Sequence, residues 1–198
     1  MKKIEIIWRH LLYQTLEKGN NFFSQKDLAA NFSYSTSTIF QALKLPRQMG
    51  AVKVGGRGFS LQDAEKLLYH WASVRNLGKD IIYQTKVDLP ILELEASVPP
   101  GVVFALYSAY RLNFNDTPAD YDSVCLYAGK LFLTAIKERF PPVKGRPNLY
   151  ILAADPYLSN YGQYTTLAQT FVDLWNVDTW YAKEFINALR EKINGLLS

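Results

Sequence analysis

Residues 24–61 constrain the fold of this chain more than any other segment. Two short stretches have apolar residues at helical spacing, and two later stretches, 51–54 and 59–62, alternate between apolar and polar residues. Alternation is typical of half-buried strands, and the glycine-rich residues 55–58 between them are typical of a tight reversal. The segment therefore predicts two packed helices followed by a β-hairpin.

A further helix is expected in front of this segment, because apolar residues there form one helical stripe. Its members are Ile4, Ile7, Trp8, Leu11, Leu12 and Leu16. The second helix is expected to open at Ser24, which has Asp27 three positions later, as in a capping box. The third is expected to begin near Ser35 or Thr36, and Pro46 is expected to limit its length.

The third helix has a defined outer face if Ile39, Ala42 and Leu43 point toward the core. Rotation by about 100° per residue then places a mixed polar set on the opposite side. That set is Ser37, Phe40, Gln41 and Lys44. Ser, Gln and Lys side chains hydrogen-bond base edges and phosphates, so this face is a candidate for contact with DNA.

The tip of the hairpin is basic and rich in glycine. Glycines at 55, 56 and 58 permit positive φ angles and a tight turn. Arg57 on the tip and Lys53 beside it are placed to reach a minor groove or the adjacent phosphates.

Charge is divided unevenly along the chain. Residues 1–78 contain 11 Lys and Arg against 5 Asp and Glu, whereas residues 79–198 contain 11 against 13. A polyanion would therefore be attracted to the first part only. We expect two domains with different roles, at residues 1–78 and 79–198, joined after a helix within residues 63–76.

Composition excludes several other classes. No apolar run approaches the 18 or so residues that cross a bilayer, and Glu5, Arg9 and His10 interrupt the apolar N-terminal region, which argues against a signal peptide. One cysteine, Cys125, leaves no internal disulfide and favours a reduced, cytoplasmic protein. Cys125 and two distant histidines give no zinc-site spacing, so we expect no metal and no cofactor.

The second part mixes strand and helix patterns, which predicts a small α/β sandwich and an α+β chain overall. Strands are expected at 81–89, 121–128 and 148–153, and residues 91–96 as a further strand or a loop. Helices are expected at 101–112, 130–140, 165–175 and about 180–197.

The first part resembles the winged-helix superfamily of bacterial and archaeal regulators. The resemblance lies in Ser37–Leu43 (S-T-I-x-x-A-L), Gly50-Ala51-Val52, and Gly56-Arg57 leading into a strand. It implies a winged helix-turn-helix that binds double-stranded DNA with its second motif helix in the major groove. Winged helices also serve as protein-binding modules, so an interaction adaptor without DNA binding is an alternative.

The second part resembles the C-terminal region of AbiEi-type antitoxins. The similar segments are residues 98–101, 105–110 and 168–176. The resemblance implies a domain related to nucleotidyltransferases, in a toxin–antitoxin system whose antitoxin represses its own operon. Its implied partners are operon DNA and a cognate toxin.

Catalysis by this second part is the remaining alternative. Nucleotidyltransferases hold metal ions with a D-x-D pair after a Gly-Ser turn, and Asp120 and Asp122 have that spacing, with Asp155 after a later strand. However, Tyr107 precedes Ser108 where glycine would allow close approach to a phosphate. We therefore expect no enzyme and no catalytic residue.

The sequence thus predicts a transcriptional regulator, and a homodimer would match two half-sites. Ser37, Gln41 and Lys44 are assigned to the major groove, and Thr36 and Arg47 to phosphates. Lys53 and Arg57 are assigned to the hairpin contact.

Overall fold

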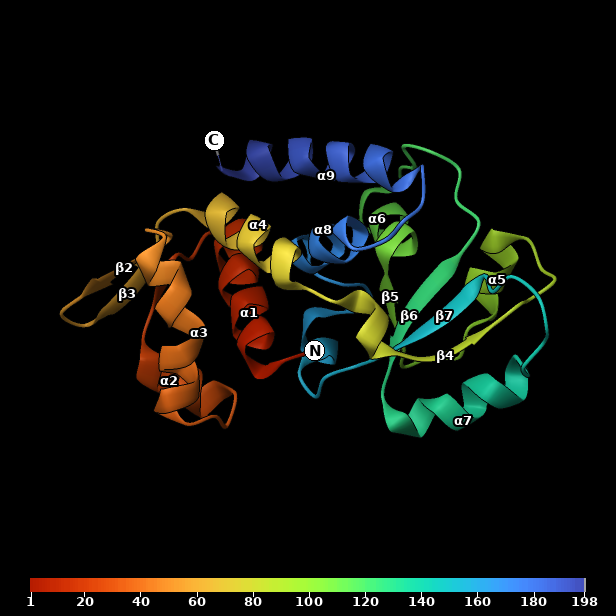
Figure 1. Ribbon diagram of the computed structural model, residues 1–198, viewed down its shortest axis with the longest axis horizontal. Coiled ribbons are helices and arrows are strands. Elements are labelled where there is room, and N and C mark those ends of the chain that lie inside the picture. Colours follow the sequence, from red (N-terminus) through yellow and green to blue (C-terminus); the bar gives the residue numbers. More distant parts are fainter. Residues whose placement is uncertain (198) are drawn as a thin grey trace.

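The computed structural model describes residues 1–197 and contains two β-sheets with helices packed around them (Figure 1). This mixed architecture confirms the expected α+β class. The first sheet and its helices are α1 (Lys3–Lys18), β1 (Phe22–Phe23), α2 (Gln25–Asn31), α3 (Thr36–Gln48), β2 (Val52–Gly55), β3 (Gly58–Leu61) and α4 (Ala64–Val74).

Polar caps fix where the early helices begin. The Ser24 hydroxyl accepts a hydrogen bond from the Asp27 backbone N–H, and the Ser35 hydroxyl accepts one from Thr38. Asp63 caps α4 in the same way. The predicted starts of these helices are therefore confirmed, because each cap satisfies a backbone donor that has no partner inside the helix.

Helix α3 continues through Pro46, so the expectation that this proline limits the helix was wrong. Proline lacks the N–H that would bond to the carbonyl of Ala42, four residues earlier. The indole N–H of Trp8, on α1, donates to that carbonyl at 2.7 Å instead. A side chain from another helix thus replaces the missing backbone donor.

The hairpin forms as predicted, but not for the predicted reason. Strands pair antiparallel in the order β1-β3-β2, with Gly55 opposite Gly58 and a turn at residues 56–57. None of the three glycines at the tip has a positive φ. At Gly58 a Cβ would lie 2.3 Å from the carbonyl oxygen of Phe23, so close approach of β1 explains this glycine.

The second sheet has the order β4-β7-β6-β5, with β6 and β7 parallel and both edge strands antiparallel to their neighbours. A 3₁₀ turn, η1 (Leu77–Asp80), leads into it from α4, and another, η2 (Leu158–Tyr161), follows its last strand. The remaining elements are β4 (Ile81–Thr85), α5 (Ile91–Ser97), β5 (Val103–Ala105), α6 (Leu106–Phe114), β6 (Val124–Ala128), α7 (Lys130–Arg139), β7 (Leu149–Ala153), α8 (Leu167–Trp175) and α9 (Ala182–Leu197).

Helices cover both faces of this sheet, as expected for a sandwich. Successive strand residues point to opposite faces. Tyr127 of β6 belongs to the large apolar cluster that includes α6 and α8, whereas Leu126 belongs to a smaller cluster with α5 and α7. The larger cluster also includes α1 and α4, and Figure 1 shows α8 between those helices and the sheet.

Two local predictions were wrong. Residues 91–97 form a helix, with Leu94 buried under the sheet, rather than a strand or a loop. The expected helix at 101–112 is strand β5 followed by α6, because Leu106 adopts φ +54° and redirects the chain.

Candidate nucleic-acid interface

The two faces of α3 are separated as the sequence predicts. Ile39, Ala42 and Leu43 are completely buried. The opposite face is exposed: Thr36, Ser37, Phe40, Gln41 and Lys44. The polar side chains assigned to base and phosphate contacts are therefore accessible to a partner.

Arg47 occupies the last turn of α3 and is half-buried. Its guanidinium carbon lies 5.7 Å from the centre of the Phe40 ring, an arrangement typical of a cation–π contact. Phe40 is itself 46% exposed. The aromatic ring therefore supports the guanidinium at the surface and leaves its charge available.

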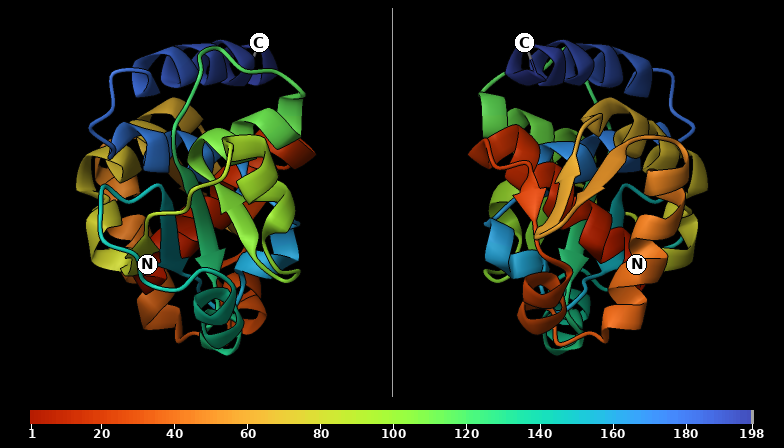
Figure 2. Two further views of the ribbon diagram at one scale, coloured as in Figure 1. Left: turned by 90° about the vertical axis from the view of Figure 1, so that its right-hand side faces the viewer. Right: turned by 90° about the vertical axis from the view of Figure 1, so that its left-hand side faces the viewer.

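The hairpin lies at the same end of the molecule as α2 and α3 (Figure 2, right). The backbone N–H of Ala51 donates to the carbonyl of Pro46, which fixes the start of β2 against the end of α3. Lys53 on β2 and Arg57 in the turn are both exposed. All seven residues assigned to DNA contact thus belong to elements at one end of the molecule.

This end of the molecule has an unbalanced charge. Between Asp27 and Asp63 the chain contains no acidic residue, while Lys44, Arg47, Lys53 and Arg57 supply positive charge. No ion pair joins any of these four to another residue in the described part of the chain. The surface therefore attracts anions without having to break internal pairs.

Asp155, the third carboxylate considered for catalysis, is not brought to the exposed Asp120 and Asp122. Asp122 precedes β6 and Asp155 follows β7, and because these strands are parallel the two residues lie at opposite ends of the sheet. Asp155 is occupied by Arg9, which donates to both of its oxygens at 2.6 and 2.8 Å. Ser108 is buried inside α6. Within residues 1–197 no group of three His, Cys, Asp or Glu side chains is arranged to hold a metal ion.

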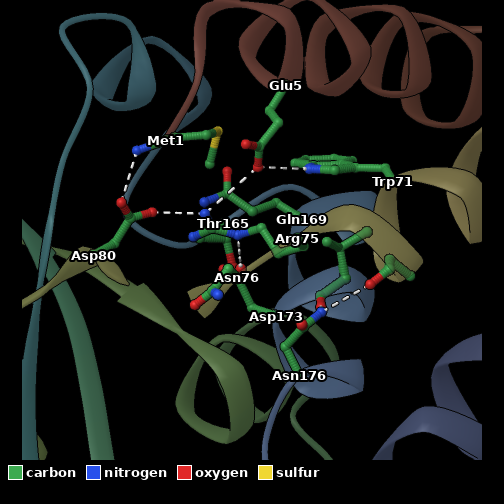
Figure 3. A network of polar contacts seen from close by, with 12 residues as sticks. Met1, Glu5, Trp71, Arg75, Asn76, Asp80, Thr165, Gln169, Asp173 and Asn176 are labelled. Carbon is green, nitrogen blue, oxygen red and sulfur yellow. Dashed lines mark hydrogen bonds and ion pairs between the residues drawn. The ribbon is translucent and has the colours of Figure 1, made fainter. Parts of the chain in front are cut away.

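A buried ionic network was missed at the sequence level (Figure 3). The guanidinium of Arg75 donates to Asp173 at 3.1 Å, to Asp80 at 2.6 Å and to the hydroxyl of Tyr127 at 3.0 Å. It also lies 3.5 Å from Glu5, whose carboxylate accepts from the Trp71 indole. The network therefore joins α1, α4, η1, α8 and the second sheet.

Burial gives this network an electrostatic consequence. Burial raises the pKa of Asp173, and the positive charge of Arg75 acts in the opposite direction.

Arg9 is also completely buried, although it was expected only as a charge that interrupts an apolar segment. The sequence signal for Arg9 was its place beside Trp8 in the apolar part of α1, but its partners Asp155 and Gln169 lie more than a hundred residues away.

In residues 1–197 no helix combines the length and apolar character needed to span a membrane. No protein-family model matches this chain, and the search of curated proteins gives no match.

Proposed function

We propose that this protein is a DNA-binding transcriptional regulator in which the N-terminal elements act as a winged helix-turn-helix. The observation that carries the proposal is the exposed, acid-free surface formed by α3 and the β2–β3 hairpin. An α-helix with its side chains fits the major groove of B-DNA. A helix and a hairpin at one end of the molecule match a docking mode in which both elements contact the same duplex.

Each part of the surface has an assigned contact. Ser37, Gln41 and Lys44 read base edges, and a good bidentate base contact contributes about 1–3 kcal/mol of discrimination. Thr36 and Arg47 bind phosphates beside the groove. Lys53 and Arg57 bind the minor groove or its phosphates.

The finer form of the proposal is an antitoxin-like repressor of its own operon. It rests on the resemblance of residues 98–101, 105–110 and 168–176 to AbiEi-type antitoxins and on the charge difference between the two parts of the chain. A homodimer would match two half-sites, and a cognate toxin would be the second partner.

The test is binding to the DNA upstream of the coding region, measured by footprinting and by fluorescence anisotropy across a range of salt concentrations. Arg57→Ala should weaken binding to all sequences alike. It should also reduce the slope of log K against log salt by about 0.9, the value for one phosphate contact. Arg139→Ala, an exposed arginine on α7 far from the hairpin (Figure 1), is the matched control and should leave the slope unchanged.

Base reading is tested separately with Gln41→Ala. This variant should bind unrelated DNA as well as the wild type does but lose preference for the protected sequence. Absence of a footprint and of any mobility shift at low salt would overturn the proposal and favour the adaptor alternative. Metal-dependent nucleotide incorporation that is lost in an Asp120→Ala/Asp122→Ala variant would favour the nucleotidyltransferase alternative.

A further inference from the structure

A cavity of about 300 Å³ lies at the end of the second sheet where β6 and β7 begin. Its walls come from η1, β4, α6 and the connection between α8 and α9. The inner wall is mainly apolar and aromatic: Leu77, Leu106, Tyr107, Cys125, Tyr150 and Leu152. A cavity of roughly 150 Å³ accommodates benzene, so this one has room for a ring with a polar substituent.

One wall residue has an unusual backbone. Leu106 is 1% exposed and adopts φ +54°, a region that is costly for a leucine. Such residues persist where the surrounding structure holds them, and they cluster at ligand sites. The turn at Leu106 directs β5 into α6 and shapes one wall of the cavity.

Charged side chains line the same cavity, and they leave a negative balance. Asp122 accepts a hydrogen bond from Tyr181 and lies 3.6 Å from the guanidinium of Arg146, an ion pair that neutralises it. Asp178 is exposed and has no ion-pair or hydrogen-bond partner in the part of the chain that the structure describes. One uncompensated carboxylate therefore stands beside the apolar wall.

An aromatic ring favours the same sign of ligand charge. The hydroxyl of half-buried Tyr150 donates to the carbonyl of Pro147, which leaves its ring to meet a ligand, whereas the Tyr107 ring is buried against Tyr181 and Phe185 and only completes the wall. The faces of tyrosine rings attract cations. Pockets that bind small molecules typically combine an apolar lining with a few convergent polar groups of this kind.

We propose that this cavity binds a small organic cation, an amine or amidine on a ring-sized apolar body, with the cation paired to Asp178. The apolar body lies against Leu106, Cys125 and Leu152. The inference is independent of DNA binding, because it rests on the cavity alone and is measured without DNA.

The experiment uses three planar probes of nearly the same shape and different charge: benzamidine, benzamide and benzoate. The chain has a single cysteine, and it lines the cavity. Protein labelled with ¹³C at the cysteine Cβ therefore gives one NMR signal that reports on this site. Benzamidine should shift the signal saturably, benzamide should bind more weakly, and benzoate should bind most weakly.

Two variants of exposed residues should move the affinity in opposite directions. Asp178→Asn should weaken benzamidine binding roughly fivefold and leave benzamide unchanged, the factor being that of one exposed ion pair. Arg146→Gln should strengthen benzamidine binding by a similar factor, because it removes a like charge and frees Asp122. Glu138→Gln, which removes an exposed carboxylate from α7, is the control and should change neither affinity.

Three results would overturn the proposal. The first is no saturable shift of the Cys125 signal with any probe at millimolar concentration. The second is benzoate binding as tightly as benzamidine. The third is a benzamidine affinity that responds to Glu138→Gln as strongly as to Asp178→Asn.

Discussion

At the scale of single residues, Trp8 substitutes for a backbone donor that Pro46 removes. Trp8→Phe should destabilise the fold by about 1–3 kcal/mol, because it leaves the buried carbonyl of Ala42 without a partner. The measurement is the free energy of unfolding in urea.

The control for this prediction restores the backbone donor. Pro46→Ala supplies an N–H that can reach Ala42 inside the helix. Trp8→Phe should therefore cost less in the Pro46→Ala background, with a coupling energy of about 0.5–3 kcal/mol. Equal costs in the two backgrounds would show that the effect comes from lost packing of the indole.

His10 gives a residue-scale prediction for pH. Burial lowers its pKa from an ordinary value of 6.5 to about 4, and the neighbouring Arg9 acts in the same direction. The folded state therefore disfavours the protonated ring. Stability from this group is fully present above pH 6.5 and is lost as the pH falls toward 4, because the unfolded chain takes up the proton first.

The slope due to His10 should reach at most about 1.4 kcal/mol per pH unit. Urea unfolding measured between pH 7 and pH 4 tests it, with His10→Gln as the comparison. The variant should show a shallower fall over this interval. Parallel curves for wild type and variant would contradict the assignment.

The orientation of single side chains was predicted correctly from sequence where it depends on residues nearby in the chain. The outward position of Gln41 and Lys44 follows from helical rotation relative to Ile39 and Ala42, and all four are placed as predicted. Prediction failed where a side chain contacts a residue that is distant in the sequence. The role of Trp8 in completing α3 depends on a contact across 34 positions, which no local pattern encodes.

At the scale of elements, the hairpin depends on one of its glycines for space. Gly58→Ala should destabilise the fold by about 1–3 kcal/mol, because the added Cβ meets the carbonyl oxygen of Phe23 and forces β1 away from β3. The measurement is again urea unfolding.

The matched control is Gly56→Ala, two positions earlier in the same hairpin. No atom lies within 4 Å of a Cβ at Gly56, and its φ is not positive. That substitution should change stability by less than about 1 kcal/mol. If both alanines cost the same, flexibility of the tip rather than packing of β1 explains the glycines.

At the scale of elements, helix starts were predicted well where a capping residue directly precedes apolar residues at helical spacing, as at Ser24, Ser35 and Asp63. The boundary between β5 and α6 was not predictable, because residues 102–106 are apolar throughout and an apolar run of that length fits a strand or a buried helix equally. The turn at Leu106 depends on packing between layers. Helix α5 was missed because only two of its seven residues, Leu94 and Glu95, are buried.

At the scale of the whole molecule, Arg75 ties the N-terminal helices to the second sheet. Arg75→Met should destabilise the protein by about 3–5 kcal/mol, since it leaves buried Asp173 and Glu5 without their cation. Arg190→Met, at an exposed arginine whose guanidinium donates to Asn187 on its own helix, should have little effect. Thermal unfolding followed by circular dichroism measures both.

The same network predicts how the molecule unfolds. One apolar cluster runs from α1 through α8 to α9, so near- and far-ultraviolet circular dichroism should report a single coincident transition. Two separate transitions would instead support independent folding of residues 1–78 and 79–198. The charge difference between these parts was visible in the sequence, whereas the apolar contacts that join them were not.

The Trp8–Pro46 pairing also limits how this scaffold can be re-engineered. The outer residues of α3 can be exchanged for those of another helix without touching the core. A replacement helix with alanine at position 46, however, supplies its own backbone N–H and makes the indole N–H of Trp8 redundant. When α3 is replaced, positions 8 and 46 should therefore be chosen together, either tryptophan with proline or another residue at position 8 with alanine.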